Sequence, residues 1–123
     1  MGNNDWLKYT FSLKNAYDAQ KIKSHILTQF ELAEVAQTDE EKKYHLSFII
    51  IGAGATGVEI TGVLLDLLYT DFLKTYHNFS IDNISIPLIE GSESILSAFS
   101  KELSDDACNS LKTRKVNIHL KEL

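Results

Sequence analysis

Three glycines carry the clearest chemical signal in this sequence. Gly52, Gly54 and Gly57 stand at G-x-G-x-x-G spacing between an apolar run and a helical pattern, a context that predicts a phosphate-binding turn for a dinucleotide. Gly52 would let the chain turn sharply, Gly54 would leave room for a pyrophosphate, and Gly57 would let the helix lie close to the strand. The first N–H groups of that helix would face the phosphates. The alternative is a turn that uses its glycines for packing alone.

Three polar side chains accompany the glycines. Glu90 ends the next apolar run, where dinucleotide folds place an acid that accepts hydrogen bonds from the adenosine ribose, and a carboxylate there favours NAD(H) over NADP(H). It lies farther beyond Gly57 than the usual spacing of about 20 residues, so we expect an insertion; the alternative is an ordinary solvated acid. Thr56 would cap the helix or bind a phosphate. Glu59, expected in the first helical turn, would either interact with the helix dipole or contact the ligand.

Composition excludes several other classes of protein. With 123 residues the chain is one domain at most. Its net charge of −5 argues against binding to nucleic acid. The single cysteine, Cys108, excludes an internal disulfide and a cysteine zinc cluster, and the four histidines lack metal-ligand spacing, so no metal site is expected. No apolar run approaches the roughly 20 residues that span a bilayer, and a cytoplasmic location is expected.

The glycines need a strand before them and a helix after them. Phe48–Ile51 is apolar without polar alternation, which predicts a strand buried on both faces of a parallel sheet. Upstream, apolar residues recur every three or four positions and predict a helix that begins after an Asn15 cap and fades near Gln37. The charged run Thr38–Lys43 is interpreted as a solvated loop or a frayed helix end.

The second half of the chain alternates helices and strands. The predicted elements are a helix from Val58 to about Tyr76, a strand at Ile84–Glu90, a loop at Ser92–Phe99, a helix from Ser100 or Ser104 to about Thr113, and a strand at Val116–Leu120. Gly62, inside the helix predicted from Val58 to about Tyr76, indicates close approach of another backbone. Pro87 indicates either an edge strand or a position where the N–H points away from the partner strand. The last turn lacks a glycine, so either Arg114 or Lys115 would take a strained conformation or the turn would be of another type.

This order, a helix followed by β-α-β-α-β, predicts the fold class. Right-handed crossovers make the three strands parallel and place helices on the sheet faces. We therefore expect an α/β, Rossmann-like three-layer fragment, with a short three-stranded parallel sheet, flanking helices and a preceding N-terminal helix. It would be half of a doubly wound sheet.

Several segments together resemble a known family. The segments G-A-G-A-T-G-V-E-I, I-P-L-I-E-G, I-L-S-A-F and L-S-D-D-A, with G-N-N-D-W, F-S-L-K-N-A-Y-D-A and I-L-T-Q-F-E-L-A-E upstream, are similar to the NADH-binding domain of type II NADH dehydrogenases. These are FAD-dependent enzymes of the pyridine nucleotide–disulfide oxidoreductase type. The resemblance covers nearly the whole chain. It implies an inter-domain segment and N-terminal helix at residues 1–45 and a partial NADH-binding domain at residues 46–123.

The resemblance implies hydride transfer from NADH to FAD and then electron transfer to a quinone. Gly52, Gly54 and Gly57 would lie under the NADH pyrophosphate. Glu59 would contact the nicotinamide end, and Glu90 would contact the ribose. No catalytic residue is assigned in this chain. Departures from the family pattern are Ala55 and Ser97, where proline is common, Pro87 in the second strand, and the missing glycine at Lys115.

The resemblance also implies partners. The parent enzyme would be peripheral on the inner face of the cell membrane, and it would reach quinone and the membrane surface through regions outside this chain. This fragment would be inactive alone, and its open sheet edges predict a homo-oligomer. The alternatives are another two-domain flavoprotein reductase, a stand-alone NAD-binding module without redox activity, and a methyltransferase-like glycine turn.

Overall fold

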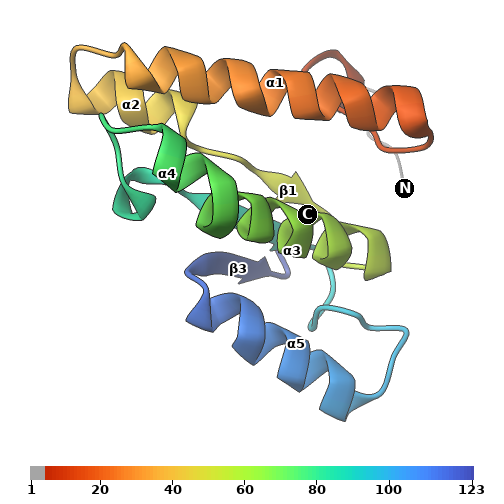
Figure 1. Cartoon of the computed structure of the whole chain (residues 1–123). Coiled ribbons are helices and arrows are strands. Elements are labelled where there is room, and N and C mark those ends of the chain that lie inside the picture. Colours follow the sequence, from red (N-terminus) through yellow and green to blue (C-terminus); the bar gives the residue numbers. More distant parts are fainter. Residues whose placement is uncertain (1–4) are drawn as a thin grey trace.

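Three parallel strands form the sheet of this computed structural model, in which residues 5–123 are described (Figure 1). The predicted α/β fold class with a three-stranded parallel sheet is confirmed. The G-N-N-D-W segment of the resemblance includes residues 2–4, which lie outside the described residues. The elements are a 3-10 turn η1 (Trp6–Lys8), α1 (Ala16–Glu34), α2 (Asp39–His45), β1 (Ile50–Ile51), α3 (Ala55–Leu67), a π-helix η2 (Leu68–Phe72), α4 (Leu73–Thr75), a 3-10 turn η3 (Ile81–Asn83), β2 (Ile86–Glu90), α5 (Lys101–Thr113) and β3 (Val116–Leu120).

The strands lie in the order β1-β2-β3, with Leu88 of β2 opposite Ile50 of β1 and Ile118 of β3. Each strand is added on the same side of the one before. Right-handed crossovers then place α3 and α5 on the same face of the sheet. The ion pair of 2.5 Å between Asp66 of α3 and Arg114 at the end of α5 agrees with this placement.

Only one face of β1 is covered by the described residues. Alternate side chains of a strand point to opposite faces, and Phe48 and Ile50 point toward the helices and the core. Ile49 and Ile51 point the other way and are 61% and 42% exposed. The prediction that β1 is buried on both faces is therefore wrong for residues 5–123, because both crossover helices lie on one side of the sheet. These residues supply two of the three expected layers.

The core joins α1 to the sheet through aromatic rings. Phe30 of α1 is 0% exposed, and its ring lies 5.6 Å from that of Phe48 and 5.0 Å from that of Phe72. Tyr76 and Phe79 stack in the same cluster. Burying such rings contributes more than their area alone, because paired aromatics add about 0.5–1.5 kcal/mol each.

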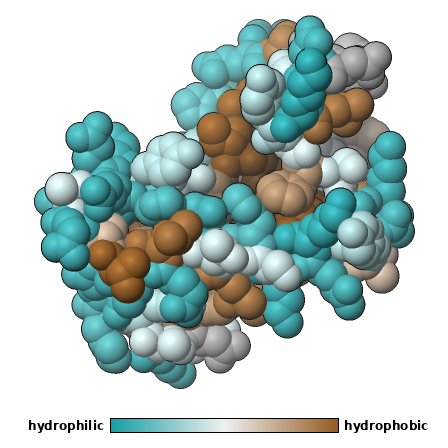
Figure 2. All heavy atoms as spheres, turned by 90° about the horizontal axis from the view of Figure 1, so that it is seen from above, coloured by the Kyte–Doolittle hydropathy of each residue, from teal (hydrophilic) through white to brown (hydrophobic). Residues whose placement is uncertain are grey.

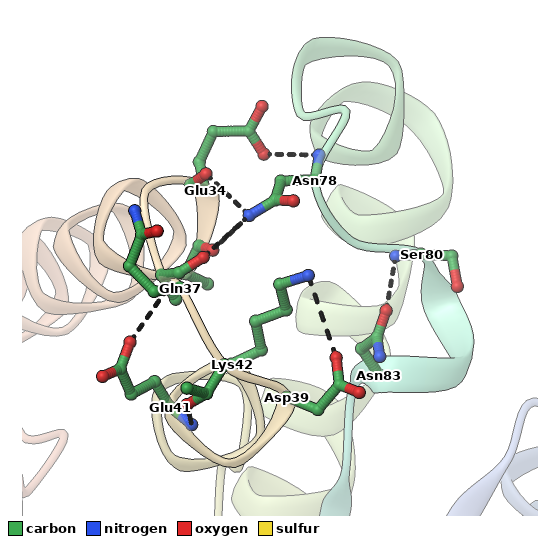
Figure 3. A network of polar contacts seen from close by, with 11 residues as sticks. Glu34, Gln37, Asp39, Glu41, Lys42, Asn78, Ser80 and Asn83 are labelled. Atoms are coloured by element: carbon green, nitrogen blue, oxygen red, sulfur yellow. Dashed lines mark hydrogen bonds and ion pairs between the residues drawn. The ribbon is translucent and has the colours of Figure 1, made fainter.

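Polar contacts at the end of α1 secure this docking (Figure 3). The carboxylate of Glu34 accepts hydrogen bonds of 2.9 Å from the backbone N–H groups of His77 and Asn78. The Asn78 side chain in turn donates to the Glu34 carbonyl. These backbone donors, that of His77 first, hold the pKa of Glu34 below its usual value. The F-E-L-A-E segment therefore attaches α1 to the chain that follows α4.

Both interpretations of Thr38–Lys43, a solvated loop and a frayed helix end, are wrong, because a separate capped helix, α2, begins at Asp39. The Thr38 side chain accepts from the N–H of Glu41 at 3.1 Å, and the Glu41 carboxylate accepts from the N–H of Gln37 (Figure 3). Acids stand in the first turn and bases in the last, as the helix dipole favours. The sequence held this Thr-x-x-Glu capping signal.

Pro87 lies in the central strand, so both predicted placements for it are wrong. Ser85 donates its N–H to the Leu46 carbonyl and accepts from the N–H of Phe48, both at 2.9 Å. Because hydrogen bonding alternates along a parallel strand, the N–H of residue 87 would also face β1, and proline has none. The pairing of β1 with β2 is accordingly interrupted after an isolated bridge at Ser85 and resumes at Ile50.

At the other helix ends, the predicted Asn15 cap is confirmed, and of the two starts left open for α5 the structure has Ser100. Asn15 caps α1 by accepting from the N–H of Asp18, and Ser100 caps α5 by accepting from the N–H of Leu103. Lys115, which follows α5 without a glycine, has a φ of 65° in the strained left-handed region. None of the helices in the described part of the chain combines the length and the apolar character that crossing a membrane requires.

Gly62 lies inside α3, and the close backbone approach predicted for it is wrong: a Cβ there would meet nothing within 4 Å. Gly62→Ala is expected to raise the free energy of unfolding by about 1 kcal/mol, because alanine loses less backbone entropy in a helix. Urea unfolding of the two proteins measures the change. A lower stability in the variant would contradict the open space seen beside Gly62.

Candidate functional site

The glycine turn lies at the carboxyl end of β1, and each glycine has a distinct environment. Gly52 has a φ of 95°, which only glycine adopts without strain. A Cβ on Gly57 would lie 1.8 Å from the Gly52 carbonyl oxygen. The conformational roles predicted for these two residues are confirmed. A Cβ on Gly54 would meet nothing within 4 Å, so the protein's own packing does not require this glycine.

Unpaired N–H groups collect at the start of α3. Gly54 is the N-cap residue, its carbonyl accepts from the N–H of Val58, and no side chain caps the helix. The first N–H groups of a helix have no partner within the helix, so they form a concentrated donor set with the positive end of the helix dipole. The capping alternative for Thr56 is wrong, because the cap position is Gly54 and Thr56 is exposed within the first turn.

Glu90 ends β2 beside the turn and is attached to it. Its carboxylate accepts from the N–H of Ala53 at 2.7 Å and from the N–H of Ser92 at 2.9 Å. These donors, that of Ala53 first, lower the pKa of Glu90 below its usual value against the opposing effect of burial. The solvated-acid alternative is therefore wrong: Glu90 is half-buried, held as a carboxylate, and fixed relative to the glycine turn.

Glu59 lies in a groove between α1 and α3, and Glu90 is not among the residues that line this groove. The groove has a volume of about 410 Å³, is lined mainly by apolar side chains of both helices, and also includes Thr56. Since α3 begins at Ala55, Glu59 lies beyond the first turn, where no acid stands; the predicted placement in that turn is wrong. The dipole effect falls off within one turn, so the dipole alternative loses its basis.

The exposed surface near α1 is mixed in character. On the face that carries α1, apolar side chains gather in separate groups among hydrophilic ones (Figure 2). Leu32 and Val35 at one end of α1 and Leu13 at the other are among the exposed apolar residues.

Sequence reasoning missed the loop that supports the site. Ser92 donates to Glu90, and the N–H of Leu96 donates to the Ala53 carbonyl at 2.8 Å. Both residues lie in the segment predicted only as a loop. The I-L-S-A-F segment was the signal that this loop had a role, but its contact with the glycine turn depends on the tertiary structure.

Comparison with known proteins places these features in a family. A family model described as pyridine nucleotide-disulphide oxidoreductase matches residues 8–123. The chain belongs to this family. The resemblance drawn from the sequence is thereby confirmed.

Individual members of the family are similar over most of this chain. The type II NADH:quinone oxidoreductase NdhA of Mycobacterium tuberculosis is 26% identical over 97% of the chain and 25% of its own length. The external alternative NAD(P)H-ubiquinone oxidoreductase B2 of Arabidopsis thaliana mitochondria is 34% identical over 77% of the chain and 16% of its own length. The structure of NDH2 from Plasmodium falciparum in complex with NADH superposes with a TM-score of 0.89 and 30% identity, over 95% of this chain and 24% of that one. The chain therefore spans about a quarter or less of these relatives.

Proposed function

We propose that this chain is the NADH-binding part of an FAD-dependent NADH:quinone oxidoreductase. The observation that carries the proposal is the pairing of an open Gly54, beside unpaired helix N–H groups, with a carboxylate at Glu90 fixed to the same turn. Oxygen atoms of a pyrophosphate suit the first group and ribose hydroxyls suit the second. The names of the relatives support NADH as the dinucleotide.

Each predicted site residue receives a part in this proposal. Gly52, Gly54 and Gly57 form the turn under the pyrophosphate, and Thr56 donates its hydroxyl to a phosphate oxygen from the first turn of α3. Glu90 still has lone pairs for two ribose hydroxyls, because each carboxylate oxygen accepts one backbone bond. Glu59, in the groove beside α3, contacts the nicotinamide end.

The chemistry proposed for the parent enzyme needs more than this chain. In the parent enzyme, FAD held outside this chain would accept a hydride from NADH, and a quinone would take the electrons. The residues of this chain bind and orient the dinucleotide, so we expect the fragment to be inactive alone. Residues 1–45 are proposed as the inter-domain segment with the N-terminal helix, and residues 46–123 as part of the NADH-binding domain; α1 packs onto the latter through Phe30.

Calorimetric titration of the 123-residue chain with NADH and with NADPH tests the proposal. We expect saturable binding of NADH and weaker binding of NADPH, because the Glu90 carboxylate repels a 2′-phosphate. Gly54→Val is the matched variant: its Cβ would meet no protein atom within 4 Å, and we expect its side chain to occupy the space of the pyrophosphate and abolish binding. A wild-type chain that binds neither nucleotide would contradict the proposal for this chain.

The exposed edge and face of β1 support a proposed homo-oligomer. Ile49 and Ile51 are apolar and exposed there, and free strand edges promote association. Sedimentation of the chain measures its mass, and a monomer at all concentrations would contradict this assembly.

A further inference from the structure

The loop between β2 and α5 holds the glycine turn by its backbone. The N–H of Leu96 donates to the carbonyl of Ala53 at 2.8 Å. To do so Leu96 takes a left-handed φ of 49°, which is unfavourable for a side chain of its size. Both residues are buried, so the contact is shielded from water. A strained residue that presents its N–H to the glycine turn indicates that the position of this turn matters.

A hydroxyl on α5 supports that loop from behind. The Oγ of Ser104 donates to the carbonyl of Ile95 at 2.7 Å, and both residues are buried. Among the described residues the buried polar side chains are those of Ser104 and Thr61, and Thr61 donates to the carbonyl of Gly57 in the same turn and helix. A hydroxyl is costly to bury without a partner, so the bond to Ile95 is the reason that serine is accommodated here.

The contact between Leu96 and Ala53 determines where the next N–H points. The peptide group between Ala53 and Gly54 is planar and trans, so its C=O and N–H point in opposite directions. With the carbonyl directed at Leu96, the N–H of Gly54 is directed away from the loop. No acceptor for this N–H is found in residues 5–123. The N–H of Ala53, on the preceding peptide, is held by Glu90 at 2.7 Å.

We propose that Ser104, acting through the Ile95–Leu96 backbone, is a positioning residue that directs the Gly54 N–H toward the pyrophosphate of the bound dinucleotide. This inference rests on the proposed function and adds to it a residue outside the glycine motif. The relay runs from the Ser104 hydroxyl to the Ile95 carbonyl, along the backbone to the Leu96 N–H, and through the Ala53 carbonyl to the Gly54 N–H.

Nuclear magnetic resonance titration of the 15N-labelled chain with ADP and with adenosine tests the relay. Ser104→Ala removes the hydroxyl, and Ser110→Ala, on the exposed side of the same helix, is the matched control. We expect Ser104→Ala to weaken ADP binding roughly three- to tenfold, about the net contribution of one hydrogen bond, because the Gly54 N–H is redirected and not removed. Adenosine affinity should not change, because adenosine carries no phosphate. Ser104→Thr keeps the hydroxyl and should restore ADP binding.

Amide hydrogen exchange gives a second measurement that needs no ligand. In Ser104→Ala the Leu96 N–H should exchange faster, while in Ser110→Ala it should keep its protection. Equal weakening of ADP and adenosine, or no change in either ADP affinity or Leu96 exchange, would overturn the inference. If the wild-type chain binds no ADP, the proposed function fails, and Leu96 exchange alone decides whether the relay exists. If Ser104→Ala does not fold, Ser104→Cys, with a weaker donor of similar size, should give the same changes to a smaller degree.

Discussion

Replacing Gly57 with alanine is expected to leave the chain unfolded or to lower its free energy of unfolding by more than about 4 kcal/mol. The added Cβ would lie 1.8 Å from the carbonyl oxygen of Gly52, far inside van der Waals contact. That oxygen belongs to backbone, so it cannot move aside as a flexible side chain would. Either α3 must shift away from β1 or the turn must open. Circular dichroism during urea unfolding measures the loss.

Gly54→Ala is the matched control for this prediction. Its Cβ would meet no atom within 4 Å, and its φ of −72° suits any residue. We therefore expect its stability to change by no more than about 0.5 kcal/mol, while its affinity for NADH falls. Two variants of equal stability would show that α3 and β1 do not approach each other as the structure describes.

Replacing Glu90 with arginine is expected to lower the affinity for NADH at least tenfold and to reverse the preference between NADH and NADPH. The variant loses the acceptor for ribose hydroxyls and gains a cation for a 2′-phosphate. It also leaves the N–H groups of Ala53 and Ser92 without their acceptor. Calorimetry with both nucleotides measures the change. An unaltered ratio of the two affinities would contradict the ribose role of Glu90.

Glu90→Gln separates charge from shape and predicts a change with pH. The pKa of Glu90 in the folded chain is lowered, chiefly by the Ala53 N–H and then by that of Ser92. Its contribution to stability is therefore complete above the unfolded pKa, near 4.5, and is lost as the pH falls through the lower folded pKa. The glutamine variant should lose less stability than wild type on acidification. A smaller dependence remains, because the pKa of Glu34 is lowered too. Unfolding free energies measured from neutral pH down to about pH 3 compare the two proteins, and parallel curves would contradict the prediction.

Features set by near neighbours in the chain were predictable. The caps at Asn15 and Ser100, the turn at Gly52 and the strained Lys115 depend on contacts within a few residues. The helix α2 belongs to this group as well, since the Thr38 side chain caps it and the Glu41 carboxylate accepts from the N–H of Gln37, but the run of charges was interpreted as a loop or a frayed helix end. The alternation of strand-like and helix-like apolar spacing was sufficient to predict the order β-α-β-α-β. Because each crossover has one favoured hand, that order also predicted parallel strands with helices on the sheet faces.

The sequence by itself therefore determined the fold class, the family, and the residues of the glycine turn. Only the tertiary structure decided which face of β1 is covered and that Pro87 lies in a central strand, because strand order and register depend on residues far apart in the chain. The same holds for the site. Glu90 and Leu96 contact Ala53 from 37 or more positions away in the sequence, and no local pattern encodes such a contact. The glycines identify a phosphate-binding turn, but its orientation is decided where β2, α5 and the loop between them pack around it.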